Sequence, residues 1–282
     1  MNSLANTPHR LSINQATIRA QCDMKQAVEE ITRAGISGIA TWRDKVHEIG
    51  LAQAARLIRD AELKVSGHCR GGMFCAADKD GIAQAREDNL RAVEEAAELG
   101  AGSLILVVGG MPPGSKDLSG ARQQVLEGLA DLLPVARAAG VKLSIEPLHP
   151  MYAADRACVN TIGQALDLCD AIDPDASGDI GVAVDVYHVW WDPELERQIA
   201  RAGKARLHAF HVCDWLVPTQ DMLLDRGMMG DGVIDIPKIR SWVEREGYDG
   251  PIEVEIFSER DWWRRPAAEV LETCKERFAT VC

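Results

Sequence analysis

The stretch Val141-Lys-Leu-Ser-Ile-Glu146-Pro-Leu-His-Pro150 has the pattern of a buried β-strand that ends in an acid. Leu143 and Ile145 alternate with smaller or polar residues. Pro147 ends the strand, because proline has no backbone N–H to continue a ladder of hydrogen bonds. We therefore expect the carboxylate of Glu146 to project from the carboxyl end of this strand.

Three later segments repeat this design, with apolar residues followed by one or two side chains that can bind a metal. They are Ile180-Gly-Val-Ala-Val-Asp185-Val-Tyr-His188, Arg206-Leu-His-Ala-Phe-His211-Val-Cys213 and Pro251-Ile-Glu-Val-Glu255-Ile-Phe-Ser258. In an α/β barrel the carboxyl ends of the strands meet at one rim, so the four segments would bring their terminal side chains together. Those side chains are Glu146, Asp185, His211 and Glu255.

Three carboxylates and one imidazole form a hard, mostly oxygen site that suits Mn²⁺ or Mg²⁺, with Co²⁺ or Zn²⁺ as alternatives. Any one of the four residues alone is better explained as a structural polar residue or a solvated acid. Four of them at matching positions on consecutive predicted strands are hard to assign to chance. The pattern therefore predicts a metal site.

Size and composition predict one soluble domain. A chain of 282 residues is close to the roughly 250 residues of a single barrel, so we expect one domain over residues 1–282. Hydrophobic residues make up 46% of the chain and charged residues 26%, which is ordinary for a globular protein. No apolar run is long enough to span a membrane, and residues 1–10 lack the pattern of a signal peptide. We therefore expect a cytoplasmic protein.

Charge and cysteine usage exclude further classes. The formal net charge of −12 speaks against nucleic acid as a partner and does little for phosphate-rich substrates. The eight cysteines are scattered without a C-x-x-C pair, which predicts reduced, mainly buried thiols.

Strand-like and helix-like segments alternate eight times, which predicts an α/β fold with a single (β/α)8 TIM barrel. We expect strands near residues 10–14, 36–41, 64–69, 103–109, 141–146, 180–187, 206–212 and 251–257. We expect helices over residues 24–34, 46–62, 82–99, 118–139, 161–172, 193–202, 236–246 and 266–279. The longest connection, Asp214 to Asp235, carries three glycines within six residues, which predicts a mobile or sharply bent loop at the metal-binding rim.

These residues permit proton transfer next to a carbonyl. A divalent cation that contacts a carbonyl and an adjacent hydroxyl of a sugar acidifies the C–H between them and stabilises the resulting enediolate. Glu146 and Glu255 could each act as base or conjugate acid while keeping one oxygen on the metal. Return of the proton on the opposite face gives epimerisation, and return to the neighbouring carbon gives isomerisation. The sequence does not separate these outcomes.

Four further residues are expected to contact the substrate. His188 is expected to hydrogen bond the substrate oxygen on which negative charge accumulates, or alternatively to orient a metal ligand. Arg226 is expected to hold a hydroxyl or carboxylate, the alternative being an exposed arginine with no ligand role. His68 ends a predicted strand and could line the pocket, and Trp42 offers an aromatic surface to the apolar face of a sugar.

Several of these motifs resemble the sugar phosphate isomerase/epimerase superfamily, the xylose-isomerase-like barrels that include ketose 3-epimerases and inosose isomerases. The motifs are Ser144-Ile-Glu146-Pro147, Val184-Asp185-Val-Tyr-His188, His208-Ala-Phe-His211-Val-Cys-Asp214, Arg226-Gly-Met-Met-Gly-Asp-Gly-Val-Ile-Asp235, and Gly247-Tyr-Asp-Gly250 leading into Glu253-Val-Glu255. The resemblance implies four metal ligands at Glu146, Asp185, His211 and Glu255, with Glu255 also transferring the proton. It implies Mn²⁺, sometimes Mg²⁺ or Co²⁺, and a dimer or tetramer, and we expect no organic cofactor.

The resemblance is weaker in one segment. Residues 148–156 differ from the corresponding part of the well-known ketose epimerases, whereas Asn160-Thr-Ile-Gly-Gln164-Ala is closer to the inosose-isomerase-like members. This difference leaves the identity of the substrate open.

Three functions remain on this reading. The leading hypothesis is a metal-dependent isomerase or epimerase of a small ketose or keto-cyclitol. The second is a metal-dependent lyase or dehydratase that acts on inosose or 3-keto-glycoside substrates through the same site. The third, from another class, is a catalytically inactive sugar-binding or partner subunit. None of the three involves nucleic acid or a membrane.

Overall fold

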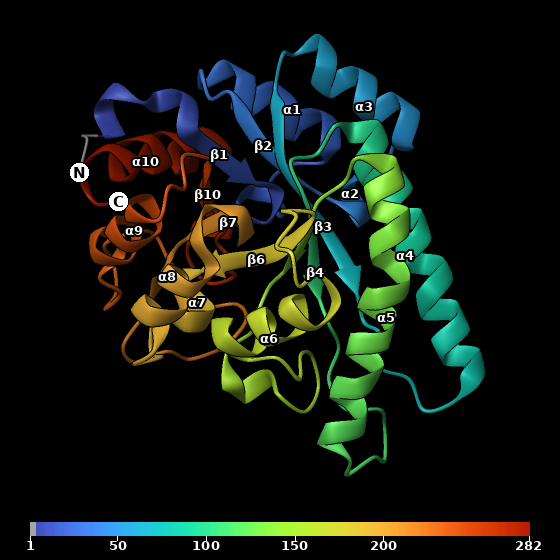
Figure 1. Ribbon diagram of the computed structural model, residues 1–282. Helices are drawn as coiled ribbons and strands as arrows, with labels where there is room; N and C mark the ends of the chain where they lie inside the picture. The colour runs from blue at the N-terminus through green and yellow to red at the C-terminus, as the bar shows by residue number, and fades with distance from the viewer. Residues whose placement is uncertain (1–3) are drawn as a thin grey trace.

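The computed structural model describes residues 4–282 and shows a closed barrel of eight parallel strands inside a layer of helices (Figure 1). The barrel strands are β1 (Leu11–Asn14), β2 (Gly38–Trp42), β3 (Lys64–Gly72), β4 (Leu104–Val107), β5 (Leu143–Ile145), β6 (Ile180–Asp185), β7 (Leu207–Val212) and β10 (Ile252–Val254). They pair in chain order, and β10 closes the ring against β1. The predicted (β/α)8 TIM barrel is confirmed.

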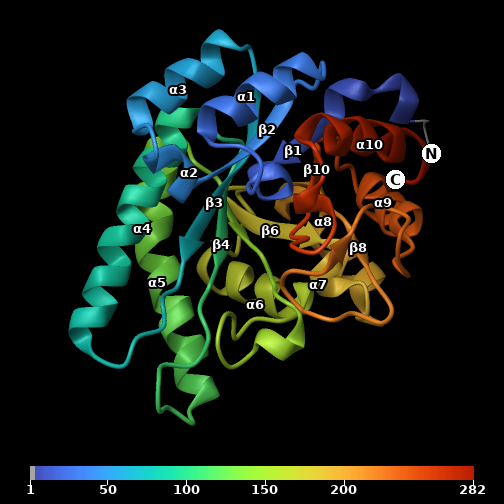
Figure 2. The same ribbon diagram turned by 180° about the vertical axis from the view of Figure 1, so that it is seen from behind.

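Helices follow the strands along the chain and lie outside them in both views (Figures 1 and 2). They are α1 (Met24–Arg33), α2 (Arg43–His47), α3 (Leu51–Asp60), α4 (Lys79–Leu99), α5 (Leu118–Ala139), α6 (Ile162–Ile172), α7 (Val186–Val189), α8 (Leu195–Arg206), α9 (Ile236–Arg245) and α10 (Ala267–Thr280). Gly100 and Gly140 end α4 and α5 in the left-handed conformation that glycine adopts without strain. Within residues 4–282, no helix is both long enough and apolar enough to cross a membrane.

Several predicted element boundaries differ from the structure, and two of the differences have a clear local cause. The helix predicted over residues 46–62 is two helices, because Gly50 adopts a φ of 84° between α2 and α3 and a helix cannot continue through that conformation. The strand predicted to reach residue 187 ends at Asp185. Its carboxylate accepts a hydrogen bond from the backbone N–H of Tyr187 and so caps the short helix α7.

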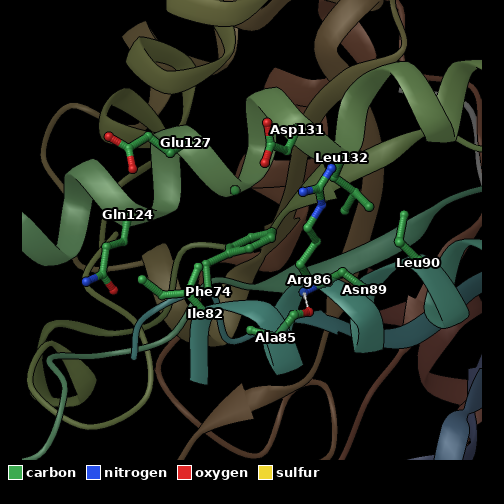
Figure 3. A pocket seen from close by; sticks show the side chains of 11 residues that line it. Phe74, Ile82, Ala85, Arg86, Asn89, Leu90, Gln124, Glu127, Asp131 and Leu132 are labelled. Atoms are coloured by element: carbon green, nitrogen blue, oxygen red, sulfur yellow. Dashed lines mark hydrogen bonds between the residues drawn. The ribbon is translucent and has the colours of Figure 1, made fainter. Parts of the chain in front are cut away.

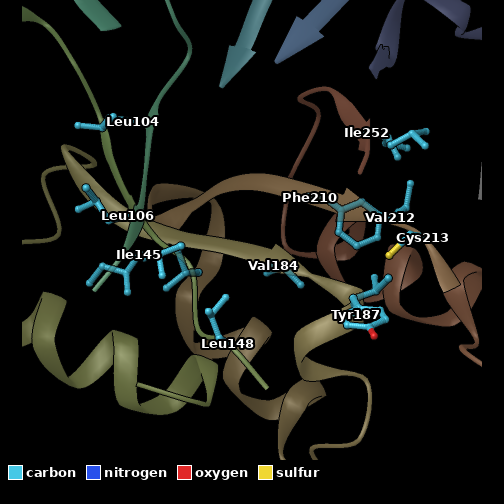
Figure 4. Packing of buried hydrophobic residues seen from close by; sticks show 14 of the residues in the cluster. Leu104, Leu106, Ile145, Leu148, Val184, Tyr187, Phe210, Val212, Cys213 and Ile252 are labelled. Carbon is cyan, nitrogen blue, oxygen red and sulfur yellow. The ribbon is translucent and has the colours of Figure 1, made fainter. Parts of the chain in front are cut away.

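Alternation along the strands creates two hydrophobic clusters. Outward-facing side chains such as Leu104, Phe210 and Val212 pack in the large cluster between strands and helices (Figure 4). A separate, small cluster inside the barrel contains Ile105, its neighbours being Cys69, Ala183 and Ala209. Most of the apolar surface is therefore buried outside the barrel, which leaves the inward positions near the strand ends free to carry polar groups.

The long connection after β7 is sharply bent. The short strands β8 (Asp214–Trp215) and β9 (Arg226–Gly227) pair antiparallel within it, and β8 lies beside α7 (Figure 2). The carboxylate of Asp214 accepts hydrogen bonds from the backbone N–H groups of Gly230 and Ile234. These contacts fold the loop back on itself and hold Arg226 at the rim of the barrel.

Candidate metal centre

The four side chains predicted to bind a metal lie together at the carboxyl ends of β5, β6, β7 and β10. They are Glu146, Asp185, His211 and Glu255, and all four are buried. One potential ligand atom of each lies within 4.8 Å of the others. These strands are consecutive in the barrel, so inward positions at matching heights converge.

Arg226 and His211 provide positive charge among these carboxylates. The guanidinium Nη1 of Arg226 lies 3.2 Å from Asp185 Oδ2 and 2.9 Å from Glu255 Oε2. On the other side of the cluster, Nδ1 of His211 lies 3.0 Å from Glu146 Oε1. The guanidinium contacts two of the three carboxylates, and the third contacts His211. Several acids gathered in a buried place favour binding of a proton or a cation.

The pKa values of the ligands follow from this crowding. Burial raises the pKa of Asp185 to about 6, although Arg226 opposes the rise. Burial also raises the pKa of Glu255, again against Arg226, and the neighbouring Glu146 carboxylate adds to the rise. Burial opposes a charge on His211, but the carboxylates of Glu253 and Glu146 outweigh it and raise its pKa well above the ordinary value. The cluster therefore retains protons that a divalent cation can replace.

The donor set fits a divalent cation, and the chemistry of its atoms supports this. Carboxylate oxygens and one imidazole nitrogen are ligands for Mn²⁺, Mg²⁺, Co²⁺ and Zn²⁺. In addition, Nε2 of His211 has no hydrogen-bond partner within the described part of the chain, and its nearest carboxylate oxygen is Glu253 Oε1 at 3.5 Å. The imidazole is thus held between two glutamates, with Nδ1 turned toward the ligand cluster.

Glu253 is a buried carboxylate behind the cluster to which the sequence reasoning assigned no role. Its Oε1 accepts a hydrogen bond from Asn14 Nδ2 at 2.8 Å, and its Oε2 accepts one from Ser66 Oγ at 2.7 Å. The same Asn14 amide donates to Glu255 Oε1 at 2.9 Å. The alternation Glu253-Val-Glu255 could have predicted its place, because residues two apart in a strand face the same side. Both acids therefore lie on the inner face of β10 or of its continuation.

A cleft opens over the ligand cluster, and Glu146 and Glu255 line it. Trp42 lies in its wall, where the indole Nε1 donates to Asn14 Oδ1 at 2.7 Å. His188 also lines the cleft.

His188 faces a donor with each ring nitrogen. Its Nδ1 accepts a hydrogen bond from the backbone N–H of His149 at 3.2 Å. Its Nε2 lies 3.6 Å from Asp185 Oδ2, which favours a proton on this atom, and 3.2 Å from Nη2 of Arg226, which opposes one. Burial, and then Arg226, lower the pKa of His188 well below its ordinary value, so the imidazole is neutral.

The structure excludes one of the two readings of Arg226 and places His68 away from the cleft. Arg226 is only 3% exposed, which excludes the alternative of an exposed arginine, and its guanidinium lies over the ring of Tyr187. It lines the cleft while it contacts two of the ligands. His68 faces the helix layer, where its ring nitrogens contact Thr41 and Glu95. Cys69 and Arg70 line the cleft in its place, so the expected substrate contact of His68 has no support in the geometry.

A second hollow lies outside the barrel, between α4 and α5 (Figure 3). Phe74, Ile82, Leu90 and Leu132 provide apolar side chains to it, and Arg86 extends from α4 toward α5. The ligand cluster does not contribute to its lining. The cluster of potential metal ligands therefore lies at the barrel mouth and not in this second hollow.

Comparison with known proteins agrees with this architecture. A family model described as xylose isomerase-like TIM barrel matches residues 28–277. An inosose isomerase of Halalkalibacterium halodurans is 27% identical over 160 residues, covering 54% of this chain and 52% of that protein. An L-ribulose-5-phosphate 3-epimerase, UlaE, of Shigella flexneri is 26% identical over 160 residues, covering 54% of this chain and 49% of that protein. The chain thus spans about half the length of the curated relatives it matches.

Solved structures match over nearly the whole chain. The protein SMc04130 of Sinorhizobium meliloti 1021 is 60% identical, with a TM-score of 0.94 over 97% of this chain and 98% of that one. The IOLI protein, solved with a bound zinc atom, is 19% identical, with a TM-score of 0.80 over 96% of this chain and 97% of that one. This second likeness concerns the fold.

Proposed function

The chain belongs to the xylose isomerase-like TIM barrel family, and from this premise we propose that it is a divalent-metal-dependent isomerase or epimerase. It moves a proton at a carbon next to a carbonyl of a small ketose or keto-cyclitol. The observation that carries the proposal is the set of four buried ligand atoms within 4.8 Å of one another, beside a cleft that Glu146 and Glu255 line. The names of the two curated relatives, an inosose isomerase and a pentulose-phosphate epimerase, support the reaction class.

Glu146, Asp185, His211 and Glu255 would hold the cation, for which we propose Mn²⁺, with Mg²⁺ or Co²⁺ as substitutes. The chemistry that such a cation supplies when bound is polarisation of a carbonyl and an adjacent hydroxyl, which makes the C–H between them more acidic. A binding protein without turnover would have no need for this pairing of two glutamates with a metal site.

Glu146 and Glu255 are the proposed proton-transfer residues. They come from β5 and β10, on either side of the strands that carry Asp185 and His211, and both line the cleft. One glutamate takes the proton from the substrate carbon, and the other returns a proton to the opposite face or to the neighbouring carbon. The first route gives epimerisation and the second gives isomerisation.

The other cleft residues orient the substrate and the ligands. His188 is proposed to hydrogen bond the substrate oxygen that gains negative charge, since it is neutral and lines the cleft. Arg226 holds Asp185 and Glu255 in place and limits the charge of the cluster. The indole ring of Trp42 is proposed to pack against the apolar face of the sugar.

Glu253 is proposed as a positioning residue for His211. Its carboxylate would accept the Nε2–H of that imidazole, which leaves a lone pair on Nδ1 for the cation. Asn14 and Ser66 hold the carboxylate in place through the two hydrogen bonds described above.

The test is exchange of substrate C–H protons with deuterated water. Metal-loaded protein is incubated with a panel of ketoses and inososes, and deuterium uptake is followed by NMR and mass spectrometry. We expect uptake at one carbon next to the carbonyl, together with an isomer of unchanged mass. A product lighter by water, or two fragments, would instead identify a lyase, and no exchange across the panel would contradict the proposal.

Glu255→Gln separates an enzyme from an inactive binding subunit. The amide keeps the size of the side chain but cannot accept the proton, so exchange should fall by roughly 100-fold or more while sugar binding largely survives. Glu272→Gln, at a position that is 72% exposed on α10, is the matched control. Unchanged exchange in Glu255→Gln would refute the role of this residue.

Three expectations remain proposals. We propose that residues 1–282 form one domain, that the protein acts in the cytoplasm, and that it assembles as a dimer or tetramer. Sedimentation velocity measures the oligomeric state, and a monomer across the micromolar range would contradict the last of these.

A further inference from the structure

Two arginines at the mouth of the cleft have no acidic partner. Arg70 and Arg156 both line the cleft that contains Glu146 and Glu255. Throughout residues 4–282, neither guanidinium forms a hydrogen bond or an ion pair with another side chain, although Arg156 lies over the ring of Tyr152 at 5.5 Å. Both side chains are partly buried. They present donors to the space that a substrate would occupy.

Other arginines near the cleft form ion pairs with acids, unlike Arg70 and Arg156. Arg226 contacts Asp185 and Glu255, and Arg43 contacts Asp88 and Glu95 at 2.7 Å each. These pairs neutralise the arginines next to the cleft.

Within residues 4–282, the acids near Arg70 and Arg156 form no ion pair with either of them. Glu146 contacts His211, and Asp44, in the hollow beyond Arg70, contacts Arg19. Asp155 is exposed beside Arg156 and forms no ion pair within the described residues. Burial and the neighbouring Arg156 guanidinium lower the pKa of Arg70, and the charge of Glu146 opposes them.

Backbone geometry holds both side chains at the mouth. The register of β3 against β4 shifts between Cys69 and Gly71, and a shift of this kind redirects the side chain inside it. Arg156 lies in the segment after β5, which is fixed to the end of β4. Its carbonyl accepts a hydrogen bond from the N–H of Gly109, and the carbonyl of Gly109 accepts one from the N–H of Cys158. The two arginines are therefore placed by the strands rather than by chance rotation of a loop.

We propose that the substrate of this protein carries an anionic group, a carboxylate or a phosphate ester, which Arg70 and Arg156 bind together. Planar guanidinium groups with several N–H donors match the oxygens of either anion, and such charge-assisted contacts are stronger than neutral ones. The proposal rests on the proposed function, because it places the reacting carbon of the same molecule between Glu146 and Glu255. It narrows the substrate class to sugar acids or sugar phosphates.

The experiment compares matched sets of ketoses that differ only at the end remote from the carbonyl. Each set contains a neutral sugar ending in CH₂OH, its terminal phosphate ester and its terminal carboxylate, for one ketopentose and one ketohexose. Exchange of the C–H proton with deuterated water is measured for wild type and for Arg70→Gln/Arg156→Gln. We expect kcat/KM to be higher for an anionic member, and the anionic-to-neutral ratio to fall by roughly tenfold or more for each arginine removed.

The two anionic members identify the source of the charge, since preference for the ester indicates a sugar phosphate and preference for the carboxylate a sugar acid. Arg56→Gln, an exposed arginine on α3, is the control for loss of one positive charge. Should the glutamine variant fail to fold by circular dichroism, Arg70→Lys/Arg156→Lys keeps the charges but not the planar fork, and the ratio should still fall.

Failure of this inference differs from failure of the proposed function. Exchange of neutral sugars with a ratio that the substitutions leave unchanged would overturn the anion site and leave the isomerase intact. If no sugar exchanges, calorimetric titration with malonate and with inorganic phosphate decides. Binding to the wild type that the double variant loses supports the anion site, and equal binding or none overturns it.

Discussion

Removing the charge behind the metal-binding histidine tests how the centre is built. Glu253→Gln keeps the shape of a side chain whose oxygens accept from Asn14 at 2.8 Å and from Ser66 at 2.7 Å, so the fold should persist. What the substitution removes is the negative charge that faces Nε2 of His211 from 3.5 Å. That charge favours the tautomer with the proton on Nε2 and makes Nδ1 a better ligand.

The expected effect is on metal affinity. Groups that orient a ligating histidine typically change affinity by about 10- to 100-fold, which corresponds to roughly 1.4–2.7 kcal/mol. Because the 3.5 Å separation exceeds an ordinary hydrogen bond, we expect the lower part of this range, about tenfold. Ser66→Ala removes only one of the contacts that hold Glu253, so its effect should be smaller.

Isothermal titration of chelator-treated protein with Mn²⁺ measures the affinity, and circular dichroism verifies the fold. Glu272→Gln on the surface of α10 is the control for loss of a carboxylate. A folded Glu253→Gln variant that binds Mn²⁺ as tightly as the wild type would show that this carboxylate does not support His211.

Two further predictions concern stability. Removal of metal with a chelator should lower the melting temperature. Mn²⁺ at about 100 times its dissociation constant should restore roughly 2.7 kcal/mol of the free energy of unfolding. Calorimetric scans with and without Mn²⁺ measure this change, and identical scans would argue against a metal site. Glu95, bonded to His68 and Arg43, has its pKa lowered to about 2 by these partners against the opposing effect of burial. Its carboxylate therefore stabilises the fold above its ordinary pKa of 4.5, and the contribution is lost as the pH falls toward 2. Glu95→Gln should destabilise the protein by about 3 kcal/mol at pH 7 and much less near pH 2. Urea unfolding of both proteins at several pH values measures the difference in free energy of unfolding. A difference that does not depend on pH would contradict the stabilising role of the Glu95 carboxylate.

The fold and the ligand cluster could be predicted because both depend on simple periodicity. Alternation of period two decides which residues face the barrel interior, and parallel strands bring their carboxyl ends to one rim. Glu146 and Asp185 were therefore predictable from position alone. Boundaries were less predictable, since Gly50 breaks a helix whose apolar spacing continues across it, and Asp185 ends a strand by capping a helix.

Side chains whose direction depends on irregular backbone were harder to predict. His68 was expected at the pocket because it stands near the end of an apparent strand, but β3 continues to Gly72 and its register shifts after Cys69. His68 faces Glu95 in the helix layer, and Arg70, which lies inside the shift, faces the cleft. A one-residue change in register exchanges the two faces of a strand, and the sequence around residues 64–72 gives no sign of where the shift occurs.

The net charge of the chain does not predict the charge of the substrate that it binds. A net charge of −12 describes the field of the whole chain, which salt screens over about 8 Å at physiological ionic strength. Inside the cleft a bound molecule responds to the groups it touches, and there Arg70 and Arg156 lack the acidic partners that Arg43 and Arg226 have. An acidic protein can therefore bind an anion wherever the fold separates a few arginines from its many carboxylates.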